Sequence, residues 1–497
     1  MHTTEATKTL LPNNRGILAA LIAIVLLGAA LRFTGLDHES LWNDELERYR
    51  QANQVDLLHA IKAGWTYEPH PPGYRVFLYF SEKIWGTSEF ALRFPGAVAG
   101  ILAIIAIFLL GRKLYSEREG LIAALFMAVQ WCPIYYSQDA GPYPILMLLS
   151  IVTVLVWRPL VEQLRQGRNP PRALSLTYIL VSIVTCWLHY FGLFFIALQG
   201  LATIWIVRSA QQKLKPGARI FAPIFIAFLP WVPFALRSLG RGPIWIPYPG
   251  EPISAAADYF AFFFNQSIGL VALVALIALW VMLRRAVRMF RQREHLHINL
   301  LSPDQLLVAW AAIPFTIVYL ISLRTPILTL RNMIIALPAV YLLSARSITR
   351  LTPKPIGQTA ISVALAAVFM YNLLYVDNYY TQPHKDQFRE AVASIVQRAD
   401  SYPQAYILGY GYGSEYFDYY FQHFGSPLRV DLSTYDSNQF PIVTAAIKRA
   451  QPKYVWLVSG LIIPNDLLLN YFNQNYQLID QQPFFQAGVW LYQKKTS

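Results

Sequence analysis

Residues 16–33 read GILAALIAIVLLGAALRF, an apolar run with a single charged side chain, Arg32. A helix needs roughly 17 to 25 mostly apolar residues to cross a membrane, so this run can form one span. The residues that follow it do not show the small-residue pattern of a signal-peptide cleavage site. The run therefore predicts a retained membrane anchor near the amino terminus.

The composition of the whole chain predicts further spans. Of the 497 residues, 55% are apolar and only 14% are charged, and the mean hydropathy is positive. A water-soluble chain could not bury so much apolar surface. About eleven segments are long and apolar enough to cross a membrane. They cover residues 16–33, 94–111, 119–136, 143–157, 173–190, 191–207, 219–236, 260–283, 306–323, 327–345 and 357–376. The sequence thus predicts a polytopic α-helical membrane protein.

The net charge of +13 is carried by alternate connections between these segments. The basic connections are residues 112–118, 158–172, 208–219, 284–293 and 346–354. Cytoplasmic loops are enriched in Lys and Arg, so this alternation is a topology signal and predicts no nucleic-acid partner. With an internal amino terminus and an odd number of spans, the loop after the first span and the carboxyl-terminal tail are both expected outside the cytoplasm.

The chain divides into a membrane part, residues 1–376 with a large first external loop at 34–93, and a tail, residues 377–497. Helical patterns cover residues 385–397 and 442–449, and apolar or alternating runs cover 405–408, 454–458 and 487–493. This mixture predicts a soluble, extracytoplasmic α/β domain.

Three glycines, Gly409, Gly411 and Gly413, follow the first strand predicted in the tail. Their spacing differs from the dinucleotide-binding fingerprint, and tyrosines fill the gaps between them. Turn glycines among surface aromatics are the preferred interpretation, and a glycan-contacting aromatic patch is the alternative.

Two adjacent carboxylates, Asp44 and Glu45, lie in the sequence Leu-Trp-Asn-Asp-Glu just beyond the first span. They stand between a membrane helix and an aromatic, proline-marked stretch, residues 65–74. Other polar residues also fall near the predicted outer ends of spans. These are Glu68, His70, Arg93, Gln138, Asp139, Tyr143, His189, Tyr190, Arg324 and Arg331. The span interiors are almost free of acidic residues, which argues against an ion-coupled transporter.

Four motifs in order resemble those of the membrane-embedded GT-C glycosyltransferases. They are LWNDE at 41–45, HPPGY at 70–74, SEFALRFP at 88–95 and YYSQDA at 135–140. The resemblance is closest to the bacterial branch related to protein O-mannosyltransferases and the lipid A aminoarabinose transferase, which use polyprenyl-phosphate sugars. It continues at residues 189–192, 245–247 and 330–332 and is thin in the tail.

The resemblance implies an inverting sugar transfer in which Asp44 is the general base. A hydroxyl nucleophile needs a positioned base as it attacks the anomeric carbon. Retention would need a second carboxylate on the opposite face of the sugar, and Glu45 is badly placed for that because it is adjacent in sequence. Glu45 and Asp139 are therefore assigned supporting roles.

The leaving phosphate needs cations or backbone donors. Arg331 matches the family arginine after a short polar loop and is the first choice, followed by Arg324. Arg93 is either a phosphate ligand or an interfacial anchor. His70 contacts phosphate, sugar or a metal, or else orders its loop. Gln138, Tyr143, His189 and Tyr190 complete the residues expected around the donor.

One departure from the family pattern concerns the segment after Gln138. Relatives continue Gln-Glu-Ala-Arg, whereas this chain reads Gln-Asp-Ala-Gly-Pro-Tyr, so Gly141 stands where the arginine is expected. This difference favours a donor sugar other than the commonest ones.

The sequence as a whole predicts a glycosyltransferase that moves a sugar from a polyprenyl-phosphate donor to a hydroxyl of a lipid, glycan or protein. It is expected in the bacterial cytoplasmic membrane, with its active site and tail outside. No cofactor is required, although Asp44, Glu45, Glu68 and Asp139 offer oxygen ligands for a divalent cation as an alternative. A transporter or flippase of lipid-linked glycans is the alternative function, and a noncatalytic scaffold is a third.

Overall fold

The computed structural model describes residues 14–63, 70–239, 246–265, 267, 269 and 299–495. The chain forms two compact units. Unit 1 comprises Met1–Thr34, Asp56–Ile84 and Leu92–Asn378, and unit 2 comprises Gly35–Val55, Trp85–Ala91 and Tyr379–Ser497. The boundary before the tail lies close to the predicted one, but two pieces of the first loop join the tail in unit 2. Glu68 lies outside the described residues.

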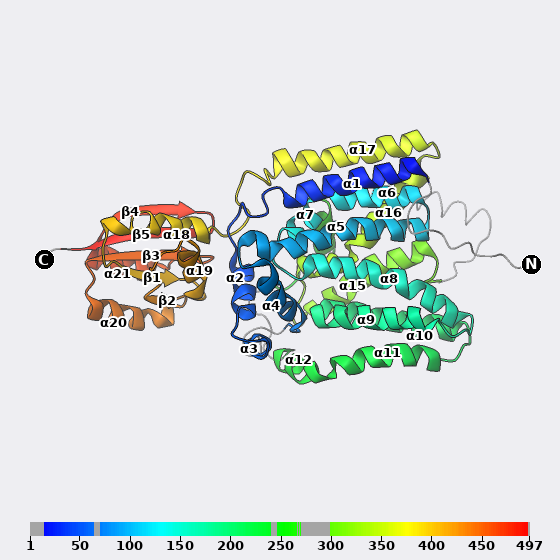
Figure 1. The fold of residues 1–497 in the computed structure, drawn as a ribbon, viewed down its shortest axis with the longest axis horizontal. Helices are drawn as coiled ribbons and strands as arrows, with labels where there is room; N and C mark the ends of the chain where they lie inside the picture. Colours follow the sequence, from blue (N-terminus) through cyan, green and yellow to red (C-terminus); the bar gives the residue numbers. More distant parts are fainter. Residues whose placement is uncertain are drawn as a thin grey trace, which may run out of the picture. The chain divides into compact units, whose positions relative to one another are not determined.

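Unit 1 is a bundle of long helices (Figure 1). Its α-helices are α1 (Arg15–Phe33), α3 (Leu57–Ala63), α4 (Gly73–Trp85), α5 (Glu89–Leu114), α6 (Glu117–Val129), α7 (Trp131–Ser137), α8 (Tyr143–Arg165), α9 (Arg172–Leu188), α10 (Tyr190–Ser209), α11 (Lys215–Phe228), α12 (Val232–Leu239), α13 (Pro252–Phe263), α15 (Pro303–Ser322), α16 (Leu337–Leu351) and α17 (Pro355–Tyr371). Short 3-10 and π segments add η1 (Leu229–Trp231), η2 (Leu330–Ala336) and η3 (Asn372–Val376).

Eight helices in the described part of the chain are long and apolar enough to cross a membrane, and the pair α6 and α7, bent by 59°, would make a ninth. Helix α9 is apolar but shorter. The predicted segment 260–283 lies largely outside the described residues. Each of the other predicted segments coincides with one of these helices, so the prediction of a polytopic α-helical membrane protein is confirmed.

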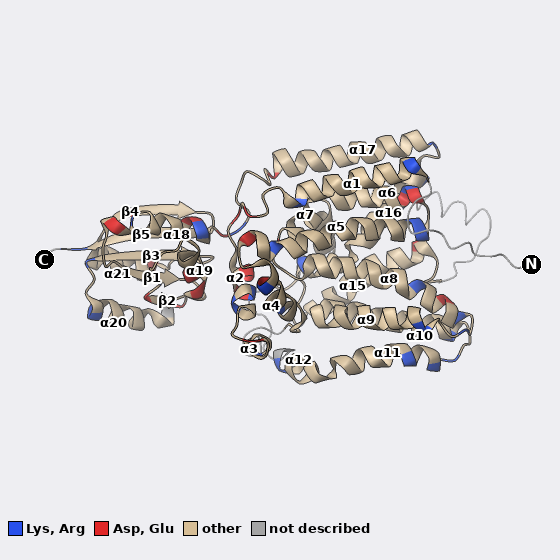
Figure 2. Cartoon of the chain, in the orientation of Figure 1, with Lys and Arg blue, Asp and Glu red and all other residues tan. Residues whose placement is uncertain are grey.

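The helix directions separate two ends of unit 1. Helices α5, α8, α10 and α16 finish with Lys or Arg in their last turns, and Figure 2 shows these cations at one end of the bundle, which we call the basic end. The opposite end contains the start of α8, the junction of α9 with α10, and the start of η2. Most residues predicted near the outer ends of spans fall there.

Unit 2 is built on a five-stranded sheet with the order β2-β1-β3-β5-β4. The strands are β1 (Tyr406–Tyr410), β2 (Leu432–Thr434), β3 (Tyr454–Gly460), β4 (Tyr476–Phe484) and β5 (Ala487–Lys494). β1 is parallel to both β2 and β3, whereas β5 runs antiparallel to β3 and to β4.

Helices cover both faces of this sheet. Val443 of α20 (Phe440–Ala450) and Phe472 of α21 (Asp466–Asn475) share a buried core with Val455 and Leu457 of β3. The alternate side of β3 faces α18 (Phe388–Val396), because a Cβ on Gly460 would lie 2.1 Å from the Phe388 ring. The tail is therefore an α/β domain, as predicted.

Segment 35–55 of the first loop is an integral part of unit 2. Its helix α2 (Asn43–Ala52) packs against α19 (Glu415–His423). The Tyr416 hydroxyl donates to Glu47 Oε2 over 2.8 Å, and the Leu41 amide donates to the Tyr420 hydroxyl over 2.5 Å. These bonds make the Leu-Trp-Asn-Asp-Glu motif part of the tail domain.

Candidate active site

Five of the predicted site residues in unit 1 form a chain of contacts at the end opposite the basic end. We call His70, Tyr143, His189, Tyr190 and Arg331 the donor cluster. The imidazoles of His70 and His189 stack with ring centroids 4.6 Å apart, and the Tyr190 ring lies 6.0 Å from His70. Tyr143 lies 6.0 Å from His189, and the Arg331 guanidinium lies 5.8 Å from the Tyr143 ring.

Two close backbone approaches assemble this cluster. His189 separates α9 from α10, and a Cβ on Gly192 would lie 2.1 Å from the Thr185 carbonyl oxygen. A Cβ on Gly73, at the start of α4, would lie 2.3 Å from the Trp187 carbonyl oxygen. Only glycine allows such contacts. The approach at Gly73 brings the His70 loop against the end of α9, where His189 lies.

Hydrogen bonds hold His189 and Tyr190 in place. His189 caps α10, because its Nδ1 accepts from the Phe191 amide over 3.2 Å. That bond assigns the acceptor role to Nδ1, so the other ring nitrogen carries the proton in the neutral form. Trp231 Nε1 donates to the Tyr190 hydroxyl over 3.0 Å. The side chains are thus fixed before any ligand arrives.

The chemistry of the donor cluster suits a phosphate-bearing ligand. A guanidinium presents several donors in a plane that matches phosphate oxygens, and two imidazoles add further donors. His189 and Tyr143 are buried, whereas His70, Tyr190 and Arg331 are half-buried. The inner part of the cluster is therefore buried, and its outer part is accessible.

Arg93 and Asp139 occupy one neighbourhood beside the first turns of α5. A Cβ on Gly96, one turn after Arg93, would lie 3.1 Å from the carbonyl oxygens of Ser137 and Asp139. Residues three apart share a helix face, so Arg93 faces the loop that carries Asp139. Both side chains are 1% exposed. Both predicted roles of Arg93, phosphate ligand and interfacial anchor, stay predictions.

Gln138 has a structural task in this neighbourhood. Its side-chain nitrogen donates to the carbonyl oxygens of Arg32 and Thr34 over 3.0 and 2.8 Å, at the end of α1. Unpaired carbonyls at a helix end need such donors. Arg32, which the sequence marks only as the last charge of the first run, is fully buried and donates to Ser137 Oγ and to the Met127 carbonyl oxygen.

Arg324 is exposed in the turn after α15. It is not among the residues joined by the ring contacts of the donor cluster described above. Arg331, at the start of η2, is therefore better placed for a role in that cluster than Arg324.

Asp44 lies in the first turn of α2, in unit 2. Its Oδ2 pairs with Arg48 Nη2 over 3.4 Å, and its side chain is 25% exposed. This i,i+4 pair orients the carboxylate while leaving it reachable. The role of Asp44 as a general base, which needs a reachable carboxylate, stays a prediction.

Glu45 differs from Asp44 in its exposure. Its side chain is fully buried, its Oε1 pairs with Lys385 Nζ over 3.2 Å, and its Oε2 accepts from the Trp42 amide over 3.3 Å. A buried carboxylate held by an ammonium and a backbone amide supports its surroundings and cannot reach a substrate. The supporting role of Glu45 stays a prediction.

Asp386 is a carboxylate that the sequence analysis did not select. Its Oδ2 accepts from the Asn43 amide over 3.2 Å, beside Asp44 and Glu45. The pKa of Asp386 is raised to about 6, mainly by burial and also by the charges of Asp44 and Glu45, and the Asn43 hydrogen bond opposes this rise. Segment 384–386 is also held by Glu39, which accepts from the His384 and Lys385 amides.

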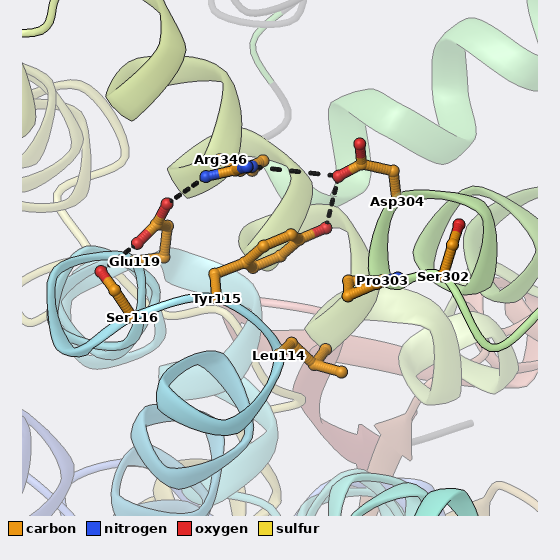
Figure 3. A pocket seen from close by; sticks show the side chains of 8 residues that line it. All are labelled: Leu114, Tyr115, Ser116, Glu119, Ser302, Pro303, Asp304 and Arg346. Carbon is orange, nitrogen blue, oxygen red and sulfur yellow. Dashed lines mark hydrogen bonds and ion pairs between the residues drawn. The ribbon is translucent and has the colours of Figure 1, made fainter. Parts of the chain in front are cut away.

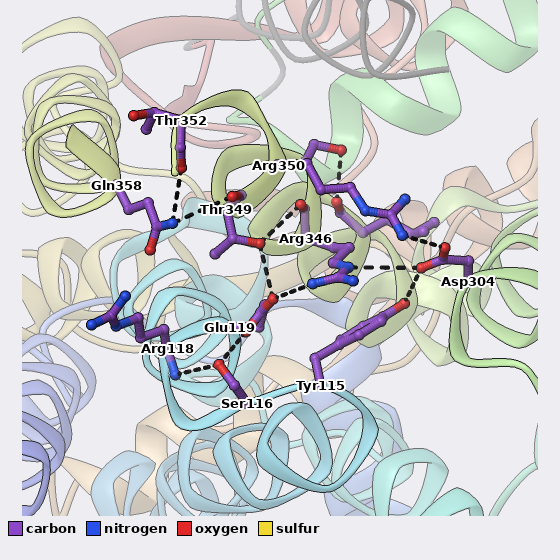
Figure 4. Close-up of polar contacts among 12 residues, drawn as sticks. Tyr115, Ser116, Arg118, Glu119, Asp304, Arg346, Thr349, Arg350, Thr352 and Gln358 are labelled. Carbon is purple, nitrogen blue, oxygen red and sulfur yellow. Dashed lines mark hydrogen bonds and ion pairs between the residues drawn. The ribbon is translucent and has the colours of Figure 1, made fainter. Parts of the chain in front are cut away.

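A pocket of about 390 Å³ lies at the basic end of unit 1, between α6, α15 and α16 (Figure 3). Arg346 pairs with Glu119 over 2.6 Å. Asp304 pairs with Arg350 over 2.7 Å and accepts from the Tyr115 hydroxyl over 2.8 Å (Figure 4). Acids and arginines compensate one another in this network, which therefore ties the helices together at this end.

Within the described ranges, no group of three or more His, Cys, Asp or Glu side chains is arranged to hold a metal ion. Glu68, one of the acids proposed as a ligand, is outside those ranges.

Comparisons with known proteins agree with this architecture. Residues 69–234 match the family model described as dolichyl-phosphate-mannose-protein mannosyltransferase. The matched region contains His70, Tyr143, His189 and Tyr190 of the donor cluster, whereas Asp44 and Arg331 lie outside it. A comparison with curated proteins found no match.

Among solved structures, ArnT from Cupriavidus metallidurans in the apo state matches with a TM-score of 0.60 and 12% identity, covering 96% of this chain and 98% of that chain. The structure of ArnT from the same organism bound to undecaprenyl phosphate matches with a TM-score of 0.58 and 13% identity over 96% and 98% of the chains. The predicted resemblance is thus confirmed: the chain has the fold of the GT-C glycosyltransferase ArnT and, over residues 69–234, is similar to the mannosyltransferase family.

Proposed function

We propose that this protein is an inverting glycosyltransferase that takes its sugar from a polyprenyl-phosphate donor. The observation that carries the proposal is the donor cluster, which gathers a guanidinium, two stacked imidazoles and two tyrosines at the end of unit 1 away from the basic connections. The family match over residues 69–234 and the ArnT fold support it.

In the proposed reaction the donor cluster binds the phosphate of the donor. The bond from the anomeric carbon to the phosphate oxygen breaks, and the polyprenyl phosphate leaves with the bonding electrons. Arg331 stabilises the charge that develops on the phosphate, because a guanidinium donates to two of its oxygens.

Asp44 is the proposed base. A hydroxyl oxygen of the acceptor attacks the anomeric carbon as Asp44 removes its proton, which contributes roughly 10²- to 10⁴-fold in general acid–base catalysis. One carboxylate suffices for inversion. Glu45 and Asp139 are not proposed to contact reacting atoms, since both are buried.

The proposed location is the bacterial cytoplasmic membrane, with the reaction at its outer face. The positive-inside rule supports this orientation, because α5, α8, α10 and α16 finish with Lys or Arg at the basic end, whereas the donor cluster lies at the starts of α8, α10 and η2. The partners are then a lipid-linked donor, membrane lipids and a lipid, glycan or protein that offers a hydroxyl. No metal is needed for these steps, since a carboxylate supplies the base and cations of the chain meet the phosphate.

The test is sugar transfer by the purified protein in lipid nanodiscs from a panel of radiolabelled polyprenyl-phosphate sugars to a membrane extract. We expect Asp44→Asn to reduce transfer by at least about 100-fold. Asp37→Asn is the matched control, because Asp37 is an exposed acid of the same loop segment. It should keep full activity.

Arg331→Ala tests the phosphate site separately. We expect weaker use of the donor, with Arg324→Ala as the control that leaves it unchanged. Full transfer by Asp44→Asn would refute the mechanism. Movement of labelled donor across vesicles without formation of product would instead identify a flippase.

A further inference from the structure

The tail sheet has a topological switch point that the proposed reaction does not use. β1 lies between β2 and β3, and all three are parallel. The chain leaves β1 through α19 toward β2 and then crosses through α20 to β3 on the other side. Ligands of open α/β sheets bind in the crevice outside the carboxyl ends of strands at such a point.

Two exposed tyrosines lie beside this point, at the carboxyl ends of β1 and its other neighbour β2. Tyr412 follows β1 and Tyr435 follows β2, with ring centroids 5.4 Å apart and planes inclined by 43°. They are 53% and 47% exposed. A hydrogen bond from the Gly411 amide to the Thr434 carbonyl oxygen, 2.9 Å long, holds the two loops together. The aromatic faces are thus positioned on a fixed backbone.

Hydrogen-bonding groups lie close to these tyrosines in the sequence. A Cβ on Gly413 would lie 2.4 Å from Glu415 Oε2, so this carboxylate folds back over the Tyr412 loop. The Asp436 carboxylate accepts from the backbone and side-chain nitrogens of Asn438, each over 3.0 Å. None of the residues in loops 411–414, 435–439 and 461–465 is Lys or Arg.

The backbone is also unusual at the end of β3. Leu461 has a φ of +63°, which is a rare conformation for a bulky residue. Its amide donates to the Gln486 carbonyl oxygen over 2.8 Å. Such conformations cost free energy and concentrate at ligand sites.

We propose that Tyr412, Tyr435, Glu415, Asp436 and Asn438 form a binding site for a neutral sugar of the acceptor, which we call the tail sugar site. Aromatic rings offer apolar faces to the C–H groups of a sugar ring, while carboxylates and an amide bond its hydroxyls. Because these loops carry no Lys or Arg, the proposed ligand is a neutral sugar and not the anionic donor.

The tail sugar site is joined to the helix that carries Asp44. Tyr416, next to Glu415, bonds Glu47 of α2. The pKa of Arg50 is raised by its hydrogen bond to Glu47 and also by the charge of Glu415, so Glu415 lies near the end of α2. Asp44 lies six residues before Arg50 in α2, which corresponds to about 9 Å along the helix axis.

This geometry favours an acceptor that is a chain of several sugars. Inner sugars would rest on the tail sugar site while a terminal hydroxyl reaches Asp44. The acceptor assignment rests on the proposed function, whereas the binding site itself does not.

The test is direct binding of defined neutral mono- to tetrasaccharides, displayed as an array, to the full-length protein in nanodiscs. We expect at least one of these probes to bind the natural protein, with tighter binding of longer members. Tyr412→Ala combined with Tyr435→Ala should weaken binding about tenfold, because each aromatic contact contributes modestly. Tyr435→Phe, which keeps the ring, should bind nearly as well as the natural protein.

Two controls separate this inference from the proposed reaction. Phe424→Ala removes an exposed aromatic at the far end of α19, and Asp44→Asn removes the proposed base; both should bind the probes normally. Equal binding by the double tyrosine variant, binding of none of the saccharides, or binding of peptides instead would overturn the tail sugar site. Normal binding in a protein that transfers no sugar from any donor would leave the site standing and refute the proposed function.

Discussion

The buried pair of Glu45 and Lys385 allows a quantitative test of how unit 2 holds the segment that carries Asp44. Their side chains are 0% and 3% exposed, with 3.2 Å between Oε1 and Nζ. Lys385→Met would leave a carboxylate buried without its ammonium, a change that typically costs about 3–5 kcal/mol. Because Glu45 keeps the hydrogen bond from the Trp42 amide, we expect the lower end of that range, about 3 kcal/mol.

The matched control removes both charges. Combining Glu45→Gln with Lys385→Met replaces the pair by neutral groups of similar size, and such replacements are often nearly neutral. We therefore expect the double variant to lie within about 1 kcal/mol of the natural protein. The difference between the single and double variants measures the cost of the isolated charge.

Hydrogen exchange of the full-length protein in nanodiscs is the assay. The reporters are the amides of Asn43 and Lys385, which bond Asp386 and Glu39, and peptides of α9 serve as the reference in unit 1. A loss of 3 kcal/mol should speed exchange of the reporters roughly 100-fold. Unchanged exchange in Lys385→Met, or equal acceleration in the single and double variants, would refute the reasoning.

Three other predictions use the same protein preparation. The pKa of Asp386 is raised to about 6 from the ordinary 3.8. The resulting contribution to stability is complete below about pH 4 and is lost as pH rises through about 6. Asp386→Asn should abolish this loss of up to about 3 kcal/mol, which hydrogen exchange between pH 4 and 8 measures. Gly192→Ala places a methyl group 2.1 Å from the Thr185 carbonyl oxygen. This variant should lose about 1–3 kcal/mol of stability and use the donor less well. Gly200→Ala on the same helix should keep both stability and donor use, and equal thermal stability of the two variants would contradict the argument. Transfer activity should persist in excess EDTA, and its loss, restored by a divalent cation, would disprove the metal-free mechanism.

Local sequence was sufficient to find the spans and three of the five tail strands. The strands β1, β3 and β5 are apolar and buried, so their patterns stand out. The edge strand β4 is mostly exposed and carries Pro483, and edge strands tolerate polar residues and proline. Helix α19 escaped prediction, although it buries five of its nine residues.

In the candidate site, too, some residues could be selected from local sequence and others could not. His70, Tyr143, His189, Tyr190 and Arg331 were selected because each falls at the end of a predicted span or in a family motif. Lys385 and Asp386 were not, because nothing near them in the sequence marks them; Lys385 pairs with an acid 340 residues away. Gln138 was expected at the donor, but its amide nitrogen is occupied by the end of α1.

Composition, apolar runs and basic connections by themselves determined that this chain is a multi-pass membrane protein with an α/β tail, because membrane insertion and topology depend on local properties of the chain. Only the tertiary structure decided that the segment carrying Asp44 belongs to the tail domain and that two histidines 119 positions apart stack on each other. Those facts depend on packing between distant segments, such as the approaches that Gly73 and Gly192 permit, and no local pattern specifies the partner of a contact.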